Sequence, residues 1–257
     1  MRTYCRKAGK EILSYLQYKR IMYWLYVIEY ANFNCQAPFN SELTSEGFKQ
    51  GGLGNGVTTV SGSYWNFYNE RYPLTPNGYL NNFGNATNYG TIILIVPTVS
   101  GGEPDSEIFQ YPPKWHGIEN PFGDIWNNVD GIIINSSSIV ENDKKYNEVY
   151  ATDNPLLYSD SDYSKMKVVG IELNENGYIK EFDLGNTAEI VPRLNGGNIT
   201  QYKCDYHWTN ITTELRTLFL GGIAADSYPA GLSGFHSYHN TNRTDSNIGF
   251  RSSCILS

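Results

Sequence analysis

Cysteine is scarce in this chain of 257 residues. The four cysteines, Cys5, Cys35, Cys204 and Cys254, show no CxxC spacing. Disulfide-rich scaffolds carry far more cysteine for their length, and structural zinc sites commonly use closely spaced cysteine pairs. The sequence therefore argues against both classes of protein, and we expect the four thiols to be unpaired.

Long apolar runs are also missing. The longest, residues 21–30, is interrupted by Glu29 and follows two basic residues. A membrane-spanning helix needs about 20 predominantly apolar residues. Residues 1–10 carry charges but lack the apolar run and small-residue cleavage site of a secretory signal. We expect neither a membrane span nor a secretory signal.

Positive charge is limited as well, with 19 Lys and Arg against 26 Asp and Glu, a formal net charge of -7. Neutralising phosphates takes clustered basic residues, so we expect no nucleic-acid partner and no anionic membrane surface. Aromatic residues, by contrast, are plentiful, with 21 Tyr and 5 Trp. Burial of these rings offsets the entropy lost on folding, which predicts a folded chain. We expect one domain spanning residues 1–257.

The catalytic motifs that the composition leaves open are incomplete. Gly231-Leu-Ser-Gly234 approaches a nucleophile elbow, but Phe235 stands where the last glycine belongs. The glycines of residues 51–56 match neither a dinucleotide-binding fingerprint nor a phosphate-binding loop, and no strand precedes them. We therefore expect a protein that is not an enzyme and has no cofactor.

Metal-binding patterns are equally weak. His236 and His239 would point to opposite faces of a strand, without a nearby CxxC or HExxH partner. Asp124 and Asp130 flank a turn that could hold calcium, but their spacing is not that of an EF-hand. Turn chemistry explains these carboxylates better, and hydrogen bonding or ring stacking explains the histidines, so we expect no metal.

The secondary-structure pattern is α+β. Apolar residues recur at three- and four-residue spacings over residues 11–34, which predicts one long core helix covered on more than one face. Thr44-Ser-Glu-Gly47 is typical of the start of a second, short helix. Short β-branched runs flanked by turn residues predict strands over residues 91–96, 131–135, 168–173, 190–191, 218–220 and 248–251. Long polar connections, such as residues 142–164, favour an antiparallel arrangement.

Two segments stand out by composition. Residues 115–131 gather Trp115, Phe122 and Trp126 around glycines, which predicts a strand-turn-strand core element. Residues 223–247, between two predicted strands, contain Ser, Asn, Thr, Tyr, His and Asp but no Lys or Glu. This composition is typical of binding loops, with Tyr228, Phe235 and Tyr238 as anchors.

Three segments together resemble a known family. They are the helix of residues 23–36, the Gly-Ile-Glu-Asn-Pro-Phe-Gly-Asp-Ile-Trp element of residues 117–126, and the Leu-Gly-Gly of residues 220–222 followed by Ile-Gly-Phe-Arg at residues 248–251. The chain resembles the C-type-lectin-fold variable proteins of diversity-generating retroelements and related bacteriophage tail receptor-binding proteins. The resemblance covers about residues 11–251 and implies a C-type-lectin-like fold with short antiparallel strands and long loops.

The resemblance also implies a function and a site. A reverse transcriptase diversifies adenine-containing codons in such genes, so residues 223–247 would form a variable surface that binds a protein or glycan ligand on a cell surface. The implied ligand contacts are Asp226, Ser227, Tyr228, His236, Ser237, Tyr238, His239, Asn240, Asn242, Arg243 and Asp245. The implied fixed frame is Gly221, Gly222, Gly231, Gly249, Phe250 and Arg251. The implied location is a virion tail or a bacterial cell surface, with a homo-oligomer as one possible assembly.

Two alternatives stay open. The same resemblance extends to formylglycine-generating enzymes, which need a cysteine pair, and Cys204 and Cys254 are the late candidates; their flanking residues do not match the catalytic pattern. The other alternative is a structural virion or pilus-tip component, in which the aromatic helix supplies contacts between subunits.

Overall fold

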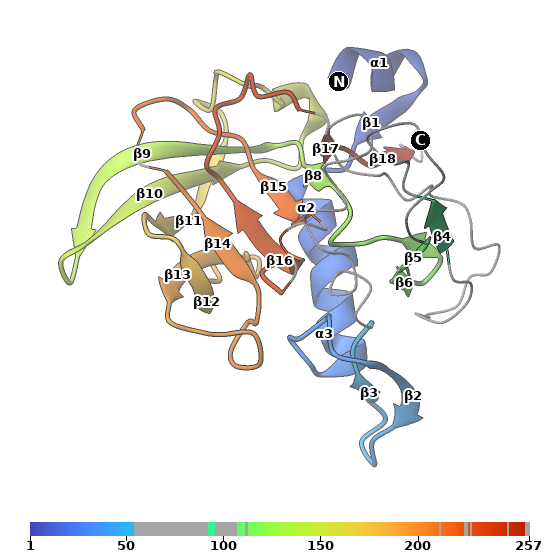
Figure 1. The fold of residues 1–257 in the computed structure, drawn as a ribbon. Helices are drawn as coiled ribbons and strands as arrows, with labels where there is room; N and C mark the ends of the chain where they lie inside the picture. Colours follow the sequence, from blue (N-terminus) through green and yellow to red (C-terminus); the bar gives the residue numbers. More distant parts are fainter. Residues whose placement is uncertain are drawn as a thin grey trace, which may run out of the picture.

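The computed structural model describes residues 1–53, 92–95, 107–110, 113–210, 212–223, 226, 228–245 and 247–254. Side chains are described for these residues except 41, 92–95, 107–110 and 254. The described chain contains both helix and sheet, which confirms the α+β class (Figure 1).

A continuous helix runs from Tyr15 to Tyr30. It consists of α2 (Tyr15–Tyr18), a π-helical turn η1 (Lys19–Trp24) and α3 (Leu25–Tyr30). A capping box starts it: the hydroxyl of Ser14 accepts from the Gln17 amide at 3.2 Å, and the Gln17 side chain accepts from the Ser14 amide at 3.1 Å. The predicted helix is therefore confirmed, but it is shorter than residues 11–34 because this cap fixes its first turn.

The helix buries its tyrosines together with Leu16 and Met22. Tyr15, Tyr18, Tyr23, Tyr26 and Tyr30 are buried in the main core. In contrast, the side chains of Ile21, Leu25 and Ile28 are exposed. The prediction of a core helix is confirmed, and these three residues form one exposed stripe at helical spacing.

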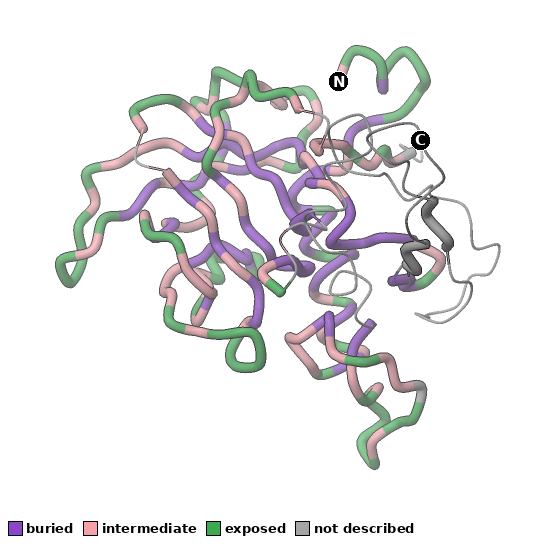
Figure 2. Tube along the Cα trace, viewed as in Figure 1, coloured by how far each residue is buried: buried purple, intermediate pink, exposed green. Residues whose placement is uncertain are grey.

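A seven-stranded sheet packs against this helix, and Figure 2 shows the buried positions concentrated where the two meet. Its strands, in spatial order, are β13 (Val191–Asn195), β12 (Gly177–Asp183), β14 (Tyr206–Trp208), β16 (Gly231–His236), β15 (Phe219–Gly221), β8 (Trp126–Asn128) and β17 (Ile248–Gly249). The pairs β14–β16 and β8–β17 are parallel and the other neighbours are antiparallel. The antiparallel expectation therefore holds with two exceptions.

A three-stranded antiparallel sheet lies beside it, in the order β11 (Lys167–Leu173), β10 (Lys144–Ala151), β9 (Ile132–Glu141). Asn142 and Asp143 join β9 to β10 with φ values of 50° and 62°. Two positive φ angles at Asn and Asp suit the tight turn of a hairpin. The expectation of a polar connection over residues 142–164 is wrong in its first half, because β10 occupies it.

Shorter elements complete the described chain. They are α1 (Arg2–Lys7), β1 (Lys10–Ile12) paired with β18 (Ser252–Cys254), β2 (Phe39–Leu43) with β3 (Lys49–Gly51), β4 (Ile92–Ile95) with β5 (Glu107–Gln110), β6 (Lys114–Trp115) with β7 (Ile118–Glu119), and the 3-10 turn η2 (Pro155–Leu157). None of the helices in this described part is long and apolar enough to cross a membrane.

The predicted second helix is wrong. Thr44 to Gly47 closes the β2–β3 hairpin: the Thr44 amide donates to the Phe48 carbonyl at 2.8 Å, and the Thr44 hydroxyl accepts from the Phe48 amide at 3.2 Å. Gly47 has φ 90°, which suits a turn and not a helix. Each of the six predicted strands contains or overlaps an observed one; the last, residues 248–251, contains β17 and ends before β18.

Candidate functional site

The segment of residues 223–247 is not one irregular loop. Strand β16 occupies its middle and is paired on both sides, with β14 and β15. Phe235, expected as a ligand anchor, is fully buried in the core, and Ser237, expected as a contact, is fully buried as well. Both assignments are corrected: Phe235 and Ser237 are interior residues. Ser227 lies outside the described residues.

The two halves of the segment emerge at opposite ends of β16. Tyr228 precedes the strand with 54% of its side chain exposed, and Tyr238 follows it with 42% exposed. The strand between them is bulged, because the adjacent residues Leu220 and Gly221 of β15 pair with Phe235 and Gly231, which are four residues apart. The predicted contacts therefore fall into two groups, one before β16 and one after it.

A row of aromatic rings crosses one face of the sheet and meets β16 at its last residue, His236. Cross-strand partners share a face, as do residues two apart in a strand. By the pairings Tyr178–Tyr206, Trp208–His236, His236–Phe219 and Phe219–Asn128, this outer face carries one continuous row. Its members are Tyr178, Tyr206, Trp208, His236, Phe219 and Trp126.

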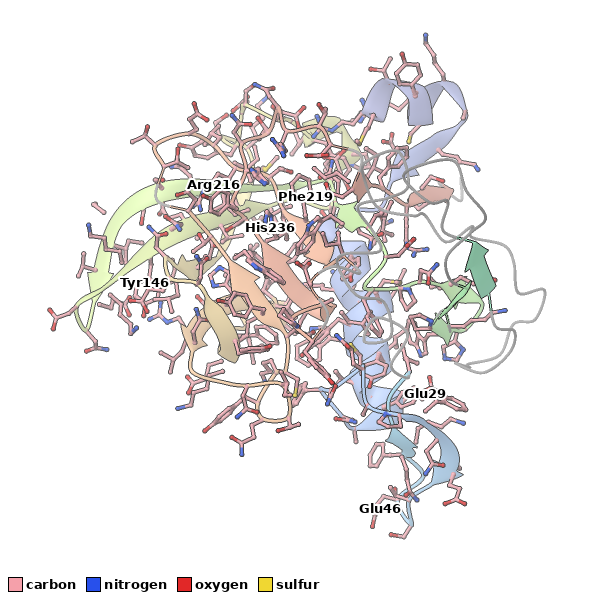
Figure 3. All side chains as sticks on the ribbon, in the orientation of Figure 1. Glu29, Glu46, Tyr146, Arg216, Phe219 and His236 are labelled. Atoms are coloured by element: carbon pink, nitrogen blue, oxygen red, sulfur yellow. The ribbon has the colours of Figure 1, made fainter. Side chains whose placement is uncertain are left out.

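Ring contacts connect the row from end to end. The centroids are 5.1 Å apart for Tyr178 and Tyr206, 4.9 Å for Tyr206 and Trp208, 5.1 Å for Trp208 and Trp126, and 4.6 Å for Trp126 and His236. Tyr178, Tyr206, Trp208 and His236 are partly exposed, whereas Trp126 and Phe219 are buried beneath them. Figure 3 shows Phe219 and His236 close together at the centre of the sheet.

The row reaches both halves of the predicted segment. At one end the Tyr206 amide donates to the carbonyl of Pro229, the neighbour of Tyr228, at 3.1 Å. At the other end the His236 and His239 rings lie 5.1 Å apart, and His239 lies 5.1 Å from Tyr238. Burial, with a further contribution from His239, lowers the pKa of His236 to about 3, so its imidazole is neutral at physiological pH.

The residues that follow β16 are held to the scaffold. The Thr217 amide donates to the His239 carbonyl at 3.2 Å, and the Asn240 side chain donates to Glu214 at 2.9 Å. The guanidinium of Arg243 donates to Asp245 at 2.6 Å. Asn242 is exposed and lies in a turn. This part of the segment is therefore an ordered, polar surface with Tyr238 projecting from it.

Asp226 has a structural role. Its carboxylate accepts from the Ile223 amide at 2.9 Å, and its own amide donates to the Ile223 carbonyl at 3.0 Å. Burial raises its pKa to about 6, against the effect of the Ile223 hydrogen bond. Asp226 thus closes a turn next to Gly222, where a Cβ atom would stand 2.5 Å from that of Ala230.

A buried polar network supports the sheet behind the segment. Glu172 of β11 bonds His207 at 2.7 Å and accepts from the Ser237 hydroxyl; its second oxygen lies 3.7 Å from the Arg216 guanidinium. Arg216 also donates to the Thr209 hydroxyl at 2.9 Å and the Ser237 carbonyl at 3.2 Å. Glu172, His207, Arg216 and Ser237 are completely buried.

This network contains the residue types of a catalytic triad in a different arrangement. The Ser237 hydroxyl bonds the carboxylate directly, whereas a catalytic serine bonds the imidazole that removes its proton. Burial raises the pKa of Glu172, but the hydrogen bond and charge of His207, then Arg216 and Ser237, outweigh it and leave this pKa lowered. The carboxylate is ionised, and the network is a structural tie.

The serine of the incomplete nucleophile motif is also interior. Ser233 is fully buried, and its amide and hydroxyl each donate to the same oxygen of Asp205 at 2.7 Å. A Cβ atom added to Gly231 would stand only 1.9 Å from the other carboxyl oxygen of Asp205. Gly231, expected as part of the fixed frame, is therefore a position at which a side chain cannot fit without moving Asp205.

The described thiols are free and enclosed. Cys5, Cys35 and Cys204 are buried and unpaired, and the side chain of Cys254 lies outside the described residues. Burial, with Asp205 next in effect, raises the pKa of Cys204 to about 12, and it raises that of Cys35 well above the usual range. Such thiols are protonated at neutral pH and are poor nucleophiles.

Within the described side chains, no cluster of three or more His, Cys, Asp or Glu residues is placed to hold a metal ion. Comparison with known family models, curated proteins and solved structures gives no match. The family resemblance of the three sequence segments therefore stays a prediction.

The aromatic row was missed at the sequence level. Tyr178, Tyr206, Trp208 and Trp126 all lie outside residues 223–247 and join the surface only through strand pairing. The alternation of Tyr206 and Trp208 around buried His207 was the one local signal, since residues two apart share a face of a strand.

Proposed function

We propose that this chain is a non-catalytic recognition module with a C-type-lectin-like fold, related to the variable proteins of diversity-generating retroelements. It binds a ligand displayed on a cell surface, as a component of a virion tail or a bacterial surface. The observation that carries the proposal is the partly exposed aromatic row, which passes near Tyr228 through Tyr206 and near Tyr238 through His236 and is backed by a buried polar network.

Ring chemistry supports recognition. Tyrosine and tryptophan supply a large amphipathic contact area and have only two side-chain torsions to immobilise on binding. Here most rings are already fixed by neighbours at centroid distances of 4.6 to 5.1 Å. A surface that is ordered before binding loses little entropy when the ligand arrives, which favours affinity.

The burial of the nucleophilic groups supports a binding function over a catalytic one. The hydroxyls of Ser233 and Ser237 are buried and donate to carboxylates. The thiols of Cys35 and Cys204 are buried with raised pKa values. A nucleophile has to reach its substrate and needs an adjacent base or a lowered pKa, so none of these four groups suits that role.

We expect Tyr228→Ala and Tyr238→Ala each to weaken ligand binding by about 2 kcal/mol, or about 30-fold, with little change in thermal stability. Both side chains are about half exposed, so their loss removes contact area without opening the core. The measurement is binding of the full chain to an array of purified bacterial surface polysaccharides and immobilised surface proteins, with melting temperatures taken alongside.

Tyr4→Ala is the matched control, because Tyr4 on α1 is 77% exposed and lies outside the proposed surface. Equal losses for all three variants, or losses of stability in place of binding, would contradict the proposal. If the wild-type chain binds nothing on the array, the recognition function itself is contradicted.

A second candidate function is a structural virion or pilus-tip component. It is favoured by the exposed stripe of Ile21, Leu25 and Ile28 on the central helix, since exposed apolar patches often mark contacts between subunits. Sedimentation separates the two functions. The structural role would be favoured if the wild-type chain forms an assembly that Leu25→Asp reduces to monomers, and if the wild-type chain binds nothing on the ligand array.

A further inference from the structure

A cavity of about 260 Å³ opens at one end of the aromatic row. It is lined by α1 and the end of β1, by the chain from β8 to β9, by Asp160, by Thr217 just before β15, and by the segment after β16. The side chains that matter for its chemistry are Arg2, Asn128, Asp130, Thr217, Thr241 and Arg243. The cavity therefore has a scaffold side and a side formed by residues 241–244.

The cavity continues the aromatic face of the sheet. Asn128 pairs with Phe219 and lies two residues from Trp126, so it shares the face that carries the rings. The Thr217 hydroxyl donates to the side-chain Oδ1 of Asn128 at 3.3 Å, and the Thr217 amide donates to the backbone carbonyl of His239. One ligand can therefore lie over the rings and place its end in the cavity.

The formal charges of the four charged side chains that line the cavity, Arg2, Asp130, Asp160 and Arg243, add up to zero. The Arg2 guanidinium donates to Asp130 at 2.5 and 2.7 Å and to Asp160 at 2.7 and 3.0 Å. The Arg243 guanidinium donates to Asp245 at 2.6 Å, outside the lining. A charged ligand would have to compete with these pairs for its partner, and taking one partner from a close ion pair is unfavourable.

The remaining lining is rich in small neutral polar groups. Thr3, Thr217, Thr241 and Thr244 bring hydroxyls, and Asn128 brings an amide. Hydroxyls act as donors and acceptors at once, so they pair well with other hydroxyls. The volume is below the roughly 300–1,000 Å³ of pockets that hold drug-sized ligands. The cavity suits one small, uncharged molecule with several hydroxyl groups.

We propose that this cavity binds a single neutral pyranose unit of a surface glycan, whose adjoining units stack on the aromatic row. The inference rests on the proposed recognition function and names the class of ligand. A pyranose presents hydroxyls at its edge and C–H groups on its faces. The edge meets the threonines and Asn128, and the faces of the next units meet Trp208 and Tyr206.

A folded protein ligand fits these observations less well. Specific protein interfaces bury about 800 Å² on each partner, far more than a cavity for one small molecule provides. A protein would contact Tyr238 and the exposed residues beside it and leave the cavity empty. The two ligand classes therefore differ in whether the cavity matters for binding.

The test titrates the full chain with methyl glycosides of neutral hexoses and with the corresponding uronic acids, followed by amide chemical shifts in NMR. A neutral glycoside is expected to shift the signals of Asn128, Thr217 and Thr241. Thr217→Val removes a hydroxyl at constant shape, and Thr244→Trp fills the cavity from an exposed position. Each is expected to weaken glycoside binding about tenfold or more.

Thr200→Trp is the control, since Thr200 is exposed on the turn between β13 and β14 and does not line the cavity. It is expected to bind the glycoside like wild type. Melting temperatures show whether Thr217→Val acts through stability, and Thr244→Trp provides the second route if it does. Tighter binding of uronic acids than of neutral glycosides would overturn the neutral class.

The polysaccharide array separates failure of this inference from failure of the proposed function. If Tyr238→Ala weakens array binding while Thr217→Val and Thr244→Trp leave it unchanged, the cavity is not a subsite and the recognition function stands. If the wild-type chain binds only immobilised proteins, the glycan class is overturned. Parallel losses in the Tyr238 variant and both cavity variants on the same polysaccharide support the inference.

Discussion

Glu172→Ala is expected to lower the free energy of unfolding by about 3–5 kcal/mol, the usual result of removing one partner from a buried ionic network. The substitution leaves Arg216 completely buried with its nearest carboxylate gone. Among the residues that the structure describes, none is a hydrogen-bond partner of its Nε or Nη2. His207 and the Ser237 hydroxyl lose their bonds to the same carboxylate. Urea unfolding at pH 7 measures the loss.

Two further variants test whether the loss of stability comes from the buried network. Glu172→Gln keeps an acceptor oxygen and the shape, so we expect a smaller loss than for alanine. Glu175→Ala is the matched control, because Glu175 pairs with Lys144 at 2.6 Å at the surface and such pairs contribute about 0–1 kcal/mol. A similar loss for the Glu172 and Glu175 alanine variants would contradict the structural role of the network.

The network also links stability to recognition. Ser237 bonds Glu172 through its hydroxyl and Arg216 through its carbonyl, and the next residue is the exposed Tyr238. The position of Tyr238 therefore depends on a carboxylate that lies 65 residues earlier in the chain. Ligand binding by Glu172→Gln, measured where that variant is still folded, is expected to be weaker than wild type.

The helix and the strands with regular apolar patterns were predictable from the sequence. Spacings of three and four residues identified the helix, although Ser14 and Gln17 decided where it begins. β-Branched runs identified β9, β11 and β15. Strand β16 was missed, because its sequence, Gly-Leu-Ser-Gly-Phe-His, has low intrinsic strand preference. Its conformation depends on pairing with β14 and β15, which lie on either side of it.

The site was predictable only in part. Composition identified Tyr238 and also proposed Phe235, which is buried. The family resemblance implied the exposed polar neighbours of Tyr238 and also Ser237, which is buried. Composition cannot say which face of a strand a residue occupies, since a shift of one residue exchanges the two faces. The burial of Ser237 needs a partner as distant in sequence as Glu172, and the ring row needs strands that lie side by side only after folding.

Asp205→Asn is expected to change how stability depends on pH. Burial raises the pKa of Asp205 to about 7, against the lowering effect of its hydrogen bonds from Ser233. Between the ordinary value of 3.8 and about 7, the unfolded chain releases this proton while the folded protein retains it. The contribution of Asp205 to the free energy of unfolding is therefore fully present below about pH 3.8 and is lost as the pH rises to about 7. The total is on the order of 4 kcal/mol.

Urea unfolding of wild type and Asp205→Asn at pH 4.5 and pH 8 measures this effect. The wild-type free energy of unfolding should fall by about 3 kcal/mol more than that of the variant over this range. The amide adds a donor beside Gly231, which shifts the variant by a similar amount at each pH and cancels in the comparison. Asp153→Asn, at an exposed carboxylate, should follow the wild-type profile. Parallel profiles for wild type and Asp205→Asn would mean that Asp205 is ionised in the folded protein, and that the hydrogen bonds from Ser233 stabilise its charge despite complete burial.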